Sequence, residues 1–67
     1  MKNYFVSGEI NSRPIKSHSF SSEAKAFKFL GKLLNDNNLQ VETDLRMADN
    51  TEEFICSYHT RFFIGRI

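Results

Sequence analysis

One amphipathic helical segment, residues 21–38, stands between segments with the pattern of β-strands. In "SSEAKAFKFLGKLLNDNN", Ser21 or Ser22 can cap the first turn, and Glu23 suits the positively polarised start of a helix. At about 100° per residue, one broad apolar face contains Ala26, Phe27, Leu30, Leu33 and Leu34. The asparagines in residues 35–38 end the helix, because asparagine tolerates the left-handed conformation. Since a single helix can cover only one face of a sheet, this segment predicts a two-layer domain.

Four extended segments surround that helix in the sequence. Residues 3–10 and 39–47 alternate between apolar and polar side chains, as strands with one buried face do. Residues 15–20 form a weaker strand, and residues 52–64 form the last one. Turn-forming residues at 11–14 and 48–51 favour hairpins. We therefore predict one α+β domain over residues 1–67, in the order β-β-α-β-β, with a four-stranded antiparallel sheet and one helix packed on one face.

The predicted core combines the apolar faces of the helix and the strands. A chain of 67 residues buries only about 60% of the surface that its unfolded form exposes, so its stability is expected to be small. The alternation in residues 39–47 turns one set of side chains inward, and the pattern of residues 52–64 does the same. The residues expected in the core are Phe27, Leu30, Leu34, Val41, Leu45, Phe54 and Tyr58.

The sequence contains few groups arranged for chemistry. Cys56 and His59 have the spacing of half a metal site, but positions three apart on one strand point to opposite faces. Structural zinc usually needs four converging ligands, and no second cysteine is present. The sequence also lacks a glycine-rich phosphate loop and a recognisable nucleophile motif. We expect no metal, no cofactor and no enzymatic activity, with Cys56 as a small core residue.

The cellular setting is predicted from the single cysteine and from the absence of long apolar stretches. One cysteine cannot form an intramolecular disulfide, which indicates a reducing compartment. No stretch approaches the roughly 20 apolar residues that a membrane-spanning helix needs, and residues 4–6 are too few for a signal sequence. We therefore expect a cytoplasmic protein without a membrane partner.

Charge is nearly balanced over the chain but is divided along it. The formal net charge is +1, whereas residues 13–32 contain five basic residues and one acid. Residues 36–53 contain six acids and one base. Such a division either reflects ordinary solvated faces or orients the chain on a partner. The residues predicted to contact a partner are Arg13, Lys16, Lys25, Lys28, Phe29 and Lys32, although Phe29 also fits a position at the border of the core.

The C-terminal stretch "RFFIGRI" raises a second possibility for contact. In a strand, Phe62 and Phe63 point to opposite faces, so Phe63, with Ile55 and Phe5, is expected on the face without a helix. Alternatively, the tail leaves the sheet and folds over its end. If residues 54–67 form a sheet edge, a second copy can pair with them edge to edge. The residues predicted for this homodimer contact, which a foreign partner could occupy instead, are Ile55, His59, Arg61, Phe63 and Ile67.

These features favour a protein-binding module that occludes a larger partner. In size and layout the chain is similar to small accessory proteins such as virus-encoded inhibitors, antitoxins and immunity proteins, including those of phages or mobile elements. That similarity is an analogy of size and layout only. The alternative is a small nucleic-acid-binding module that uses the basic helix face. The near-neutral charge and the acidic second half make nucleic acid the weaker expectation.

Overall fold

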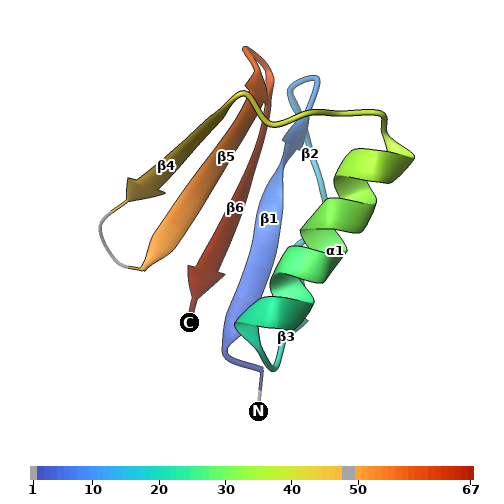
Figure 1. Cartoon of the computed structure of the whole chain (residues 1–67). Helices are drawn as coiled ribbons and strands as arrows, with labels where there is room; N and C mark the ends of the chain where they lie inside the picture. The colour runs from blue at the N-terminus through green and yellow to red at the C-terminus, as the bar shows by residue number, and fades with distance from the viewer. Residues whose placement is uncertain (1, 48–49) are drawn as a thin grey trace.

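The computed structural model describes residues 2–47 and 50–67 as an α+β fold with one helix and a six-stranded sheet (Figure 1). The elements are β1 (Tyr4–Ile10), β2 (Arg13–Pro14), β3 (His18–Phe20), α1 (Glu23–Asp36), β4 (Thr43–Met47), β5 (Thr51–Ser57) and β6 (Thr60–Arg66). The predicted α+β class is confirmed, whereas the predicted count of four strands is wrong. The single strand expected at residues 52–64 is a hairpin, and the strand expected at 15–20 is reduced to β3.

The strands pair in the order β2-β1-β6-β5-β4, all antiparallel, with β3 also paired to β1. The first and last strands of the chain thus lie side by side in the middle of the sheet. The prediction that residues 54–67 form a sheet edge is wrong, because β6 is paired on both sides. The free edges belong to β4 and to the β2–β3 segment.

A tight turn between β5 and β6 causes this difference. Ser57 pairs with Thr60, so the chain reverses over Tyr58 and His59 alone. A register shift between Ile55 and Ser57 accompanies the turn. Neither turn residue is a glycine, asparagine or proline, and neither has a positive φ. The usual sequence signals for a hairpin are therefore missing here.

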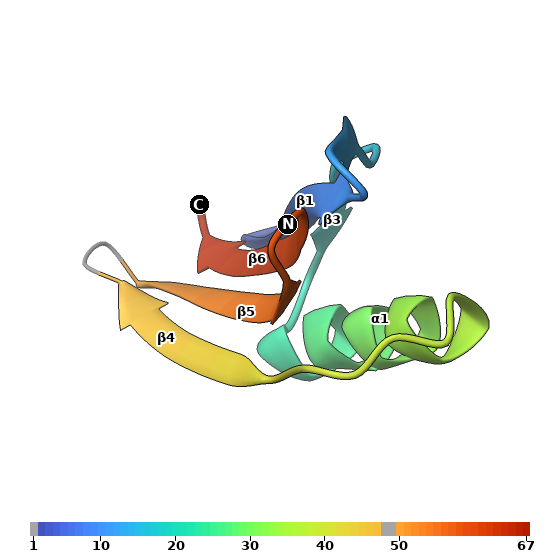
Figure 2. The ribbon, with the colours of Figure 1, turned by 90° about the horizontal axis from the view of Figure 1, so that it is seen from above.

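The helix and the sheet form two layers (Figure 2). α1 packs against β1, β3 and β6 but not against β4, so the sheet extends beyond the helix on one side. The helix begins as predicted: Ser22 is the N-cap, and its Oγ accepts a hydrogen bond of 3.2 Å from the Lys25 backbone N–H. It ends at the predicted asparagines, where Asn37 Nδ2 donates to the Leu33 carbonyl at 2.8 Å and Asn38 has a φ of 58°.

The core lies between α1 and strands β1, β5 and β6. Its buried apolar residues are Val6, Ala26, Leu30, Phe54, Cys56, Phe62 and Ile64. Burial of Leu30, Phe54 and Cys56 confirms the sequence prediction, and Leu34 and Val41 are partly buried against the core. Phe27 lies at the border, 37% exposed, with its ring edge-on to that of Phe54.

Two residues predicted for the core are exposed instead. Leu45 is 45% exposed because the register of β4 turns it to the face without the helix. Leu39 and Val41 contact the core from the irregular segment before β4, so residues 39–47 do not form the single alternating strand that was predicted. Tyr58 is 83% exposed because it lies in the turn after β5. Residues 48 and 49 of the predicted 48–51 turn lie outside the described residues.

Two turns are joined at one end of the sheet. The Asn11 backbone N–H donates to Thr60 Oγ1 at 3.0 Å, and the Ser12 N–H donates to the His59 carbonyl at 2.8 Å. Asn11 and Ser12 both have positive φ, as the two central residues of a type I′ hairpin turn require. Thr60 is 1% exposed, so its hydroxyl serves this link inside the protein.

Candidate binding surfaces

The face of the sheet opposite α1 is covered by no element among the described residues. Cross-strand pairing places residues of four strands on this face in register, because directly paired residues point to the same side. The apolar residues on it, here called the open face, are Phe5, Leu45, Met47, Ile55 and Phe63. Leu45 and Met47 are almost half exposed, and the other three are partly buried.

A charged pair lies among these apolar side chains. Arg61 Nη1 and Glu53 Oε2 are 3.1 Å apart, and Glu53 is only 8% exposed although no element lies above it. Leu45 and Phe63 flank Glu53 directly across the strands, and Ile55 flanks Arg61. Their side chains therefore shield the carboxylate, and the ion pair compensates for its burial. The Arg61 side chain remains 41% exposed at the surface.

The side chain of Phe5 closes one end of the open face. A β-carbon at Gly65 would overlap the Phe5 ring, which shows that the ring lies directly against this glycine. Gly65 is paired with Phe5 on β1 and with Thr51 on β5. The absence of a side chain at Gly65 thus makes room for the Phe5 ring, as strand glycines do for neighbouring aromatic residues.

The structure groups only part of the contact set predicted for a homodimer. Ile55, Arg61 and Phe63 lie together on the open face. His59 is in the turn before β6, exposed and edge-on to the Tyr58 ring at 4.3 Å. Ile67 follows the other end of β6, is 76% exposed, and donates its N–H to the Asn3 carbonyl at 2.6 Å. The C-terminal stretch therefore continues along the sheet and does not fold over its end.

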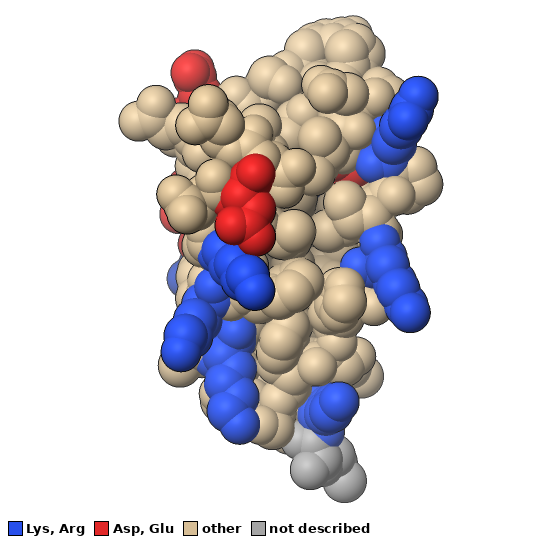
Figure 3. Space-filling view, turned by 90° about the vertical axis from the view of Figure 1, so that its right-hand side faces the viewer, with Lys and Arg blue, Asp and Glu red and all other residues tan. Residues whose placement is uncertain are grey.

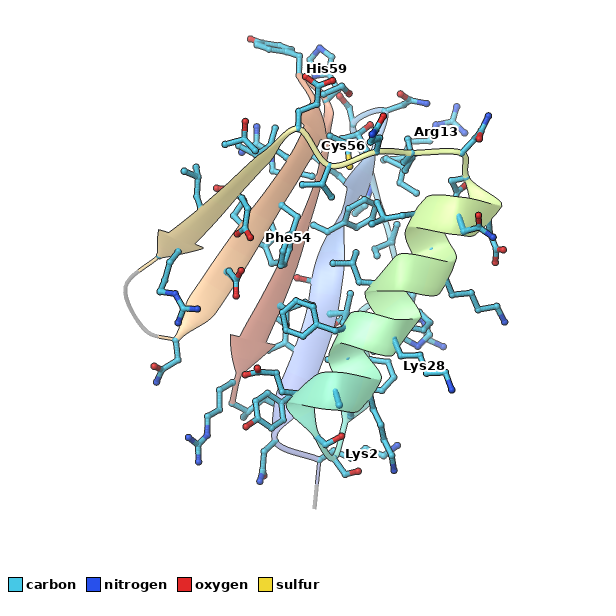
Figure 4. All side chains as sticks on the ribbon, in the orientation of Figure 1. Lys2, Arg13, Lys28, Phe54, Cys56 and His59 are labelled. Atoms are coloured by element: carbon cyan, nitrogen blue, oxygen red, sulfur yellow. The ribbon has the colours of Figure 1, made fainter. Side chains whose placement is uncertain are left out.

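The basic residues of the predicted partner set lie on another side of the molecule. Lys25, Lys28 and Lys32 are exposed on α1, Arg13 is exposed on β2, and Lys16 follows it. Figure 3 faces this side and shows Lys and Arg side chains along both of its margins with few acids between them. Figure 4 places Lys2, Arg13 and Lys28 on this same side of the ribbon.

Phe29 does not belong to that exposed surface. Its ring centroid lies 4.6 Å from that of His18 and 5.1 Å from that of Phe20. These contacts fix β3 against α1, and Phe29 is partly buried against the core. Of its two predicted roles, the one at the border of the core is confirmed.

Cys56 and His59 do not form a common site. Cys56 is buried on β5, whereas His59 lies in the following turn. Figure 4 shows His59 at the outer end of the sheet. Burial, followed by the negative charge of Glu42, raises the pKa of the Cys56 thiol. A nucleophilic cysteine needs the opposite shift. Among residues 2–47 and 50–67, no group of three His, Cys, Asp or Glu side chains is placed to hold a metal ion.

Glu52 is the acid whose surroundings change its protonation most clearly. It lies on the helix side of β5, 3.6 Å from Arg46. Burial raises the pKa of Glu52 above its ordinary value of 4.5, and a hydrogen bond with Asp44 and the charge of Asp44 raise it further. Arg46 opposes these effects by favouring the charged form. The folded protein therefore binds a proton at Glu52 more tightly than the unfolded chain does.

This shift predicts a pH dependence of stability. The pKa of Glu52 is higher in the folded protein than in the unfolded chain. The stabilisation from its protonated carboxyl is therefore complete below pH 4.5 and is lost as the pH rises through the folded pKa. Relative to Glu52→Gln, the wild type should thus lose free energy of unfolding as the pH rises above 4.5. Urea denaturation at a series of pH values below and above 4.5 measures the difference. Asp44→Asn should reduce this pH dependence, and parallel curves for wild type and Glu52→Gln would contradict the assignment.

Comparisons of the chain with protein-family models, with curated proteins and with solved structures found no match. The helix of the described chain, α1, is too short and too polar to cross a lipid bilayer. The proposal about function therefore rests on the surfaces described above. Leu45 and Met47 are the open-face residues that the sequence prediction missed, because their alternation with polar neighbours was assigned to a buried face. The register with β5 was the missing information.

Proposed function

We propose that the chain is a small non-enzymatic protein-binding module whose open face covers part of a larger partner protein. The observation that carries this proposal is the apolar open face, which stays uncovered because the single helix packs on the other face of the sheet. Contiguous apolar surface of this kind marks contact sites on small proteins. An inhibitor or antitoxin-like protein would act in this way, by excluding the partner's other ligands from the surface that it occupies.

The composition of the open face supports a protein ligand. Two phenylalanines, a methionine and an arginine are the residue types that are enriched at the centre of protein interfaces. The buried Glu53 holds the Arg61 side chain in place, so little side-chain entropy is lost when a partner contacts it. The strand backbone beneath is fixed by pairing on both sides of β6. The surface is thus largely preorganised.

The basic side of α1 contributes a second, weaker element of this proposal. Its lysines are exposed and have few acidic neighbours on that side, which suits steering toward an acidic region of the partner. The same residues support the alternative function, a nucleic-acid-binding module. Phe63 lies on the face opposite the helix lysines, so it cannot stack on bases held by them.

The test compares one variant on each surface. The tagged chain is used to capture its partner from a lysate of its native host, at low and at raised salt. Phe63→Thr removes the centre of the open face while keeping a residue that favours strands, and Lys25→Glu with Lys28→Glu reverses charge on α1. We expect Phe63→Thr to lose the partner and the lysine pair to retain it at raised salt. All variants are first compared by thermal unfolding.

The opposite pattern would favour the alternative. Binding to phosphate groups falls steeply with salt concentration, whereas an apolar contact does not. Capture of nucleic acid that is lost at raised salt and in the lysine variant, but kept by Phe63→Thr, would overturn the protein-binding proposal.

A further inference from the structure

β4 is a free sheet edge that is long enough to pair with another strand. It is the last strand in the sheet order, and all five of its residues are exposed. In Figure 1, no described part of the chain lies beyond it. The opposite edge differs, because β2 and β3 are two and three residues long and β2 contains Pro14. Proline and short strands blunt an edge, whereas β4 has neither feature.

Both faces of β4 are also accessible. All five of its residues are exposed, so its helix-side residues Asp44 and Arg46 are not covered. Leu45 and Met47 point to the open face. A strand added beside β4 would therefore gain contacts on both faces of the sheet as well as backbone hydrogen bonds.

The sequence of β4, Thr43-Asp44-Leu45-Arg46-Met47, is complementary to itself in the antiparallel direction. We propose that two copies of the chain pair through β4, antiparallel about a two-fold axis that passes between their Leu45 residues. Asp44 of each copy then faces Arg46 of the other, which makes two cross-strand ion pairs. Leu45 faces its own counterpart on the open face, and Met47 faces Thr43.

The charges select this register. Registers that pair at least three residues of β4 across a two-fold axis perpendicular to the sheet have Asp44, Leu45 or Arg46 on the axis. With Asp44 on the axis, two carboxylates lie opposite each other, and with Arg46 on the axis, two guanidinium groups do. Like charges directly opposite are unfavourable in a sheet, and opposite charges are favourable. Only the arrangement centred on Leu45 avoids both conflicts.

The charges within one copy leave Asp44 available for this contact. Within the described ranges, Asp44 forms no ion pair with a cation, and it interacts with the carboxyl of Glu52. The Arg46 side chain is 81% exposed and lies 3.6 Å from Glu52. Within one copy Arg46 serves Glu52, and Arg46 of a second copy would add the cation that Asp44 lacks.

The dimer goes beyond the proposed function. It would join two sheets into one and place two open faces side by side, with both Leu45 side chains at the junction. The module would then present twice the apolar surface to a partner, or bind two partner sites at once. The pairing itself does not depend on any partner, so its test is separate.

Charge reversal tests the pairing. Sedimentation equilibrium should show dimers of the wild type whose fraction rises with concentration. Asp44→Arg places arginine opposite Arg46, and Arg46→Asp places aspartate opposite Asp44, so each variant alone should associate at least about tenfold more weakly. An equimolar mixture of the two variants should regain wild-type association, because every cross-strand pair is then of opposite charge. A wild type that stays monomeric up to its solubility limit, or variants that dimerise unchanged, would overturn the proposal.

Cysteine crosslinking tests the register independently. Leu45→Cys lies on the axis, so two copies should join by a disulfide under mild oxidation. Met47→Cys is the matched control, because its two copies lie four residues apart along the strands, about 13 Å. A disulfide needs α-carbons within roughly 7 Å. Cys56 is buried and can remain in both variants. Equal crosslinking of the two variants would contradict the Leu45-centred register.

Discussion

Phe62→Ala is expected to lower the free energy of unfolding by about 3–5 kcal/mol and to leave much of the chain unfolded at 25 °C. Phe62 is fully buried on the central strand β6, where its pairing partners are Gly8 and Phe54. A chain of 67 residues has a total stability on the order of 3–10 kcal/mol, so this one cavity removes a large share of it. Circular dichroism with urea titration measures the loss.

The neighbouring residue supplies the control. Phe63 has the same side chain on the same strand, but it is only partly buried and faces away from the helix. Phe63→Ala should therefore cost clearly less than Phe62→Ala. Equal losses at the two positions would mean that the open face is as well packed as the core, and that it is not available for a partner.

Gly8→Ala is the second change with a large expected effect. Gly8 has a φ of 152°, which side-chain-bearing residues rarely adopt, and a β-carbon there would overlap the Arg61 carbonyl oxygen and lie 2.8 Å from the Phe62 α-carbon. Both obstacles are backbone atoms of β6, which cannot rotate aside. Backbone strain and overpacking each cost about 1–3 kcal/mol, so the sum should approach the whole stability of the fold.

Gly31→Ala is the matched control for Gly8→Ala, because it makes the same chemical change at a different position. Gly31 lies in the middle of α1, and a β-carbon there would meet no atom within 4 Å. Alanine favours the helix over glycine by about 0.5–1 kcal/mol, so this variant should be more stable than the wild type. Thermal unfolding of both variants should show shifts of opposite sign. A wild-type melting temperature for Gly8→Ala would mean that β1 and β6 are farther apart than described.

The helix was predictable from sequence to within a residue or two because its signals are local. The Ser22 cap, the apolar spacing and the asparagines at its end all act within one or two turns. The sheet was less predictable because its pairing depends on residues far apart. Tyr58 and His59 make a turn without a usual turn residue, so one long strand was expected where two exist. That difference moved the predicted free edge from β4 to the C-terminal strand.

The residues of the binding surfaces were also predictable from the sequence only where the signal is local. Exposed lysines on α1 follow directly from helical periodicity, and Phe63 and Ile55 follow from their alternation on strands. Leu45 and Met47 could not be assigned to the open face without knowing which side of β4 the helix covers. The Arg61–Glu53 contact joins two strands of a hairpin that the sequence did not reveal.

The pairing of β1 with β6 also determines when this protein can fold during its synthesis. β1 leaves the ribosome first, but its neighbour in the middle of the sheet ends at Arg66. Until β6 emerges, the apolar side of α1 and the inward side of β1 have no sheet to complete their core. Such long-range pairing slows folding and leaves strand edges open meanwhile. Until β6 is available, the side of β1 that will pair with it therefore remains an open edge that another strand can occupy.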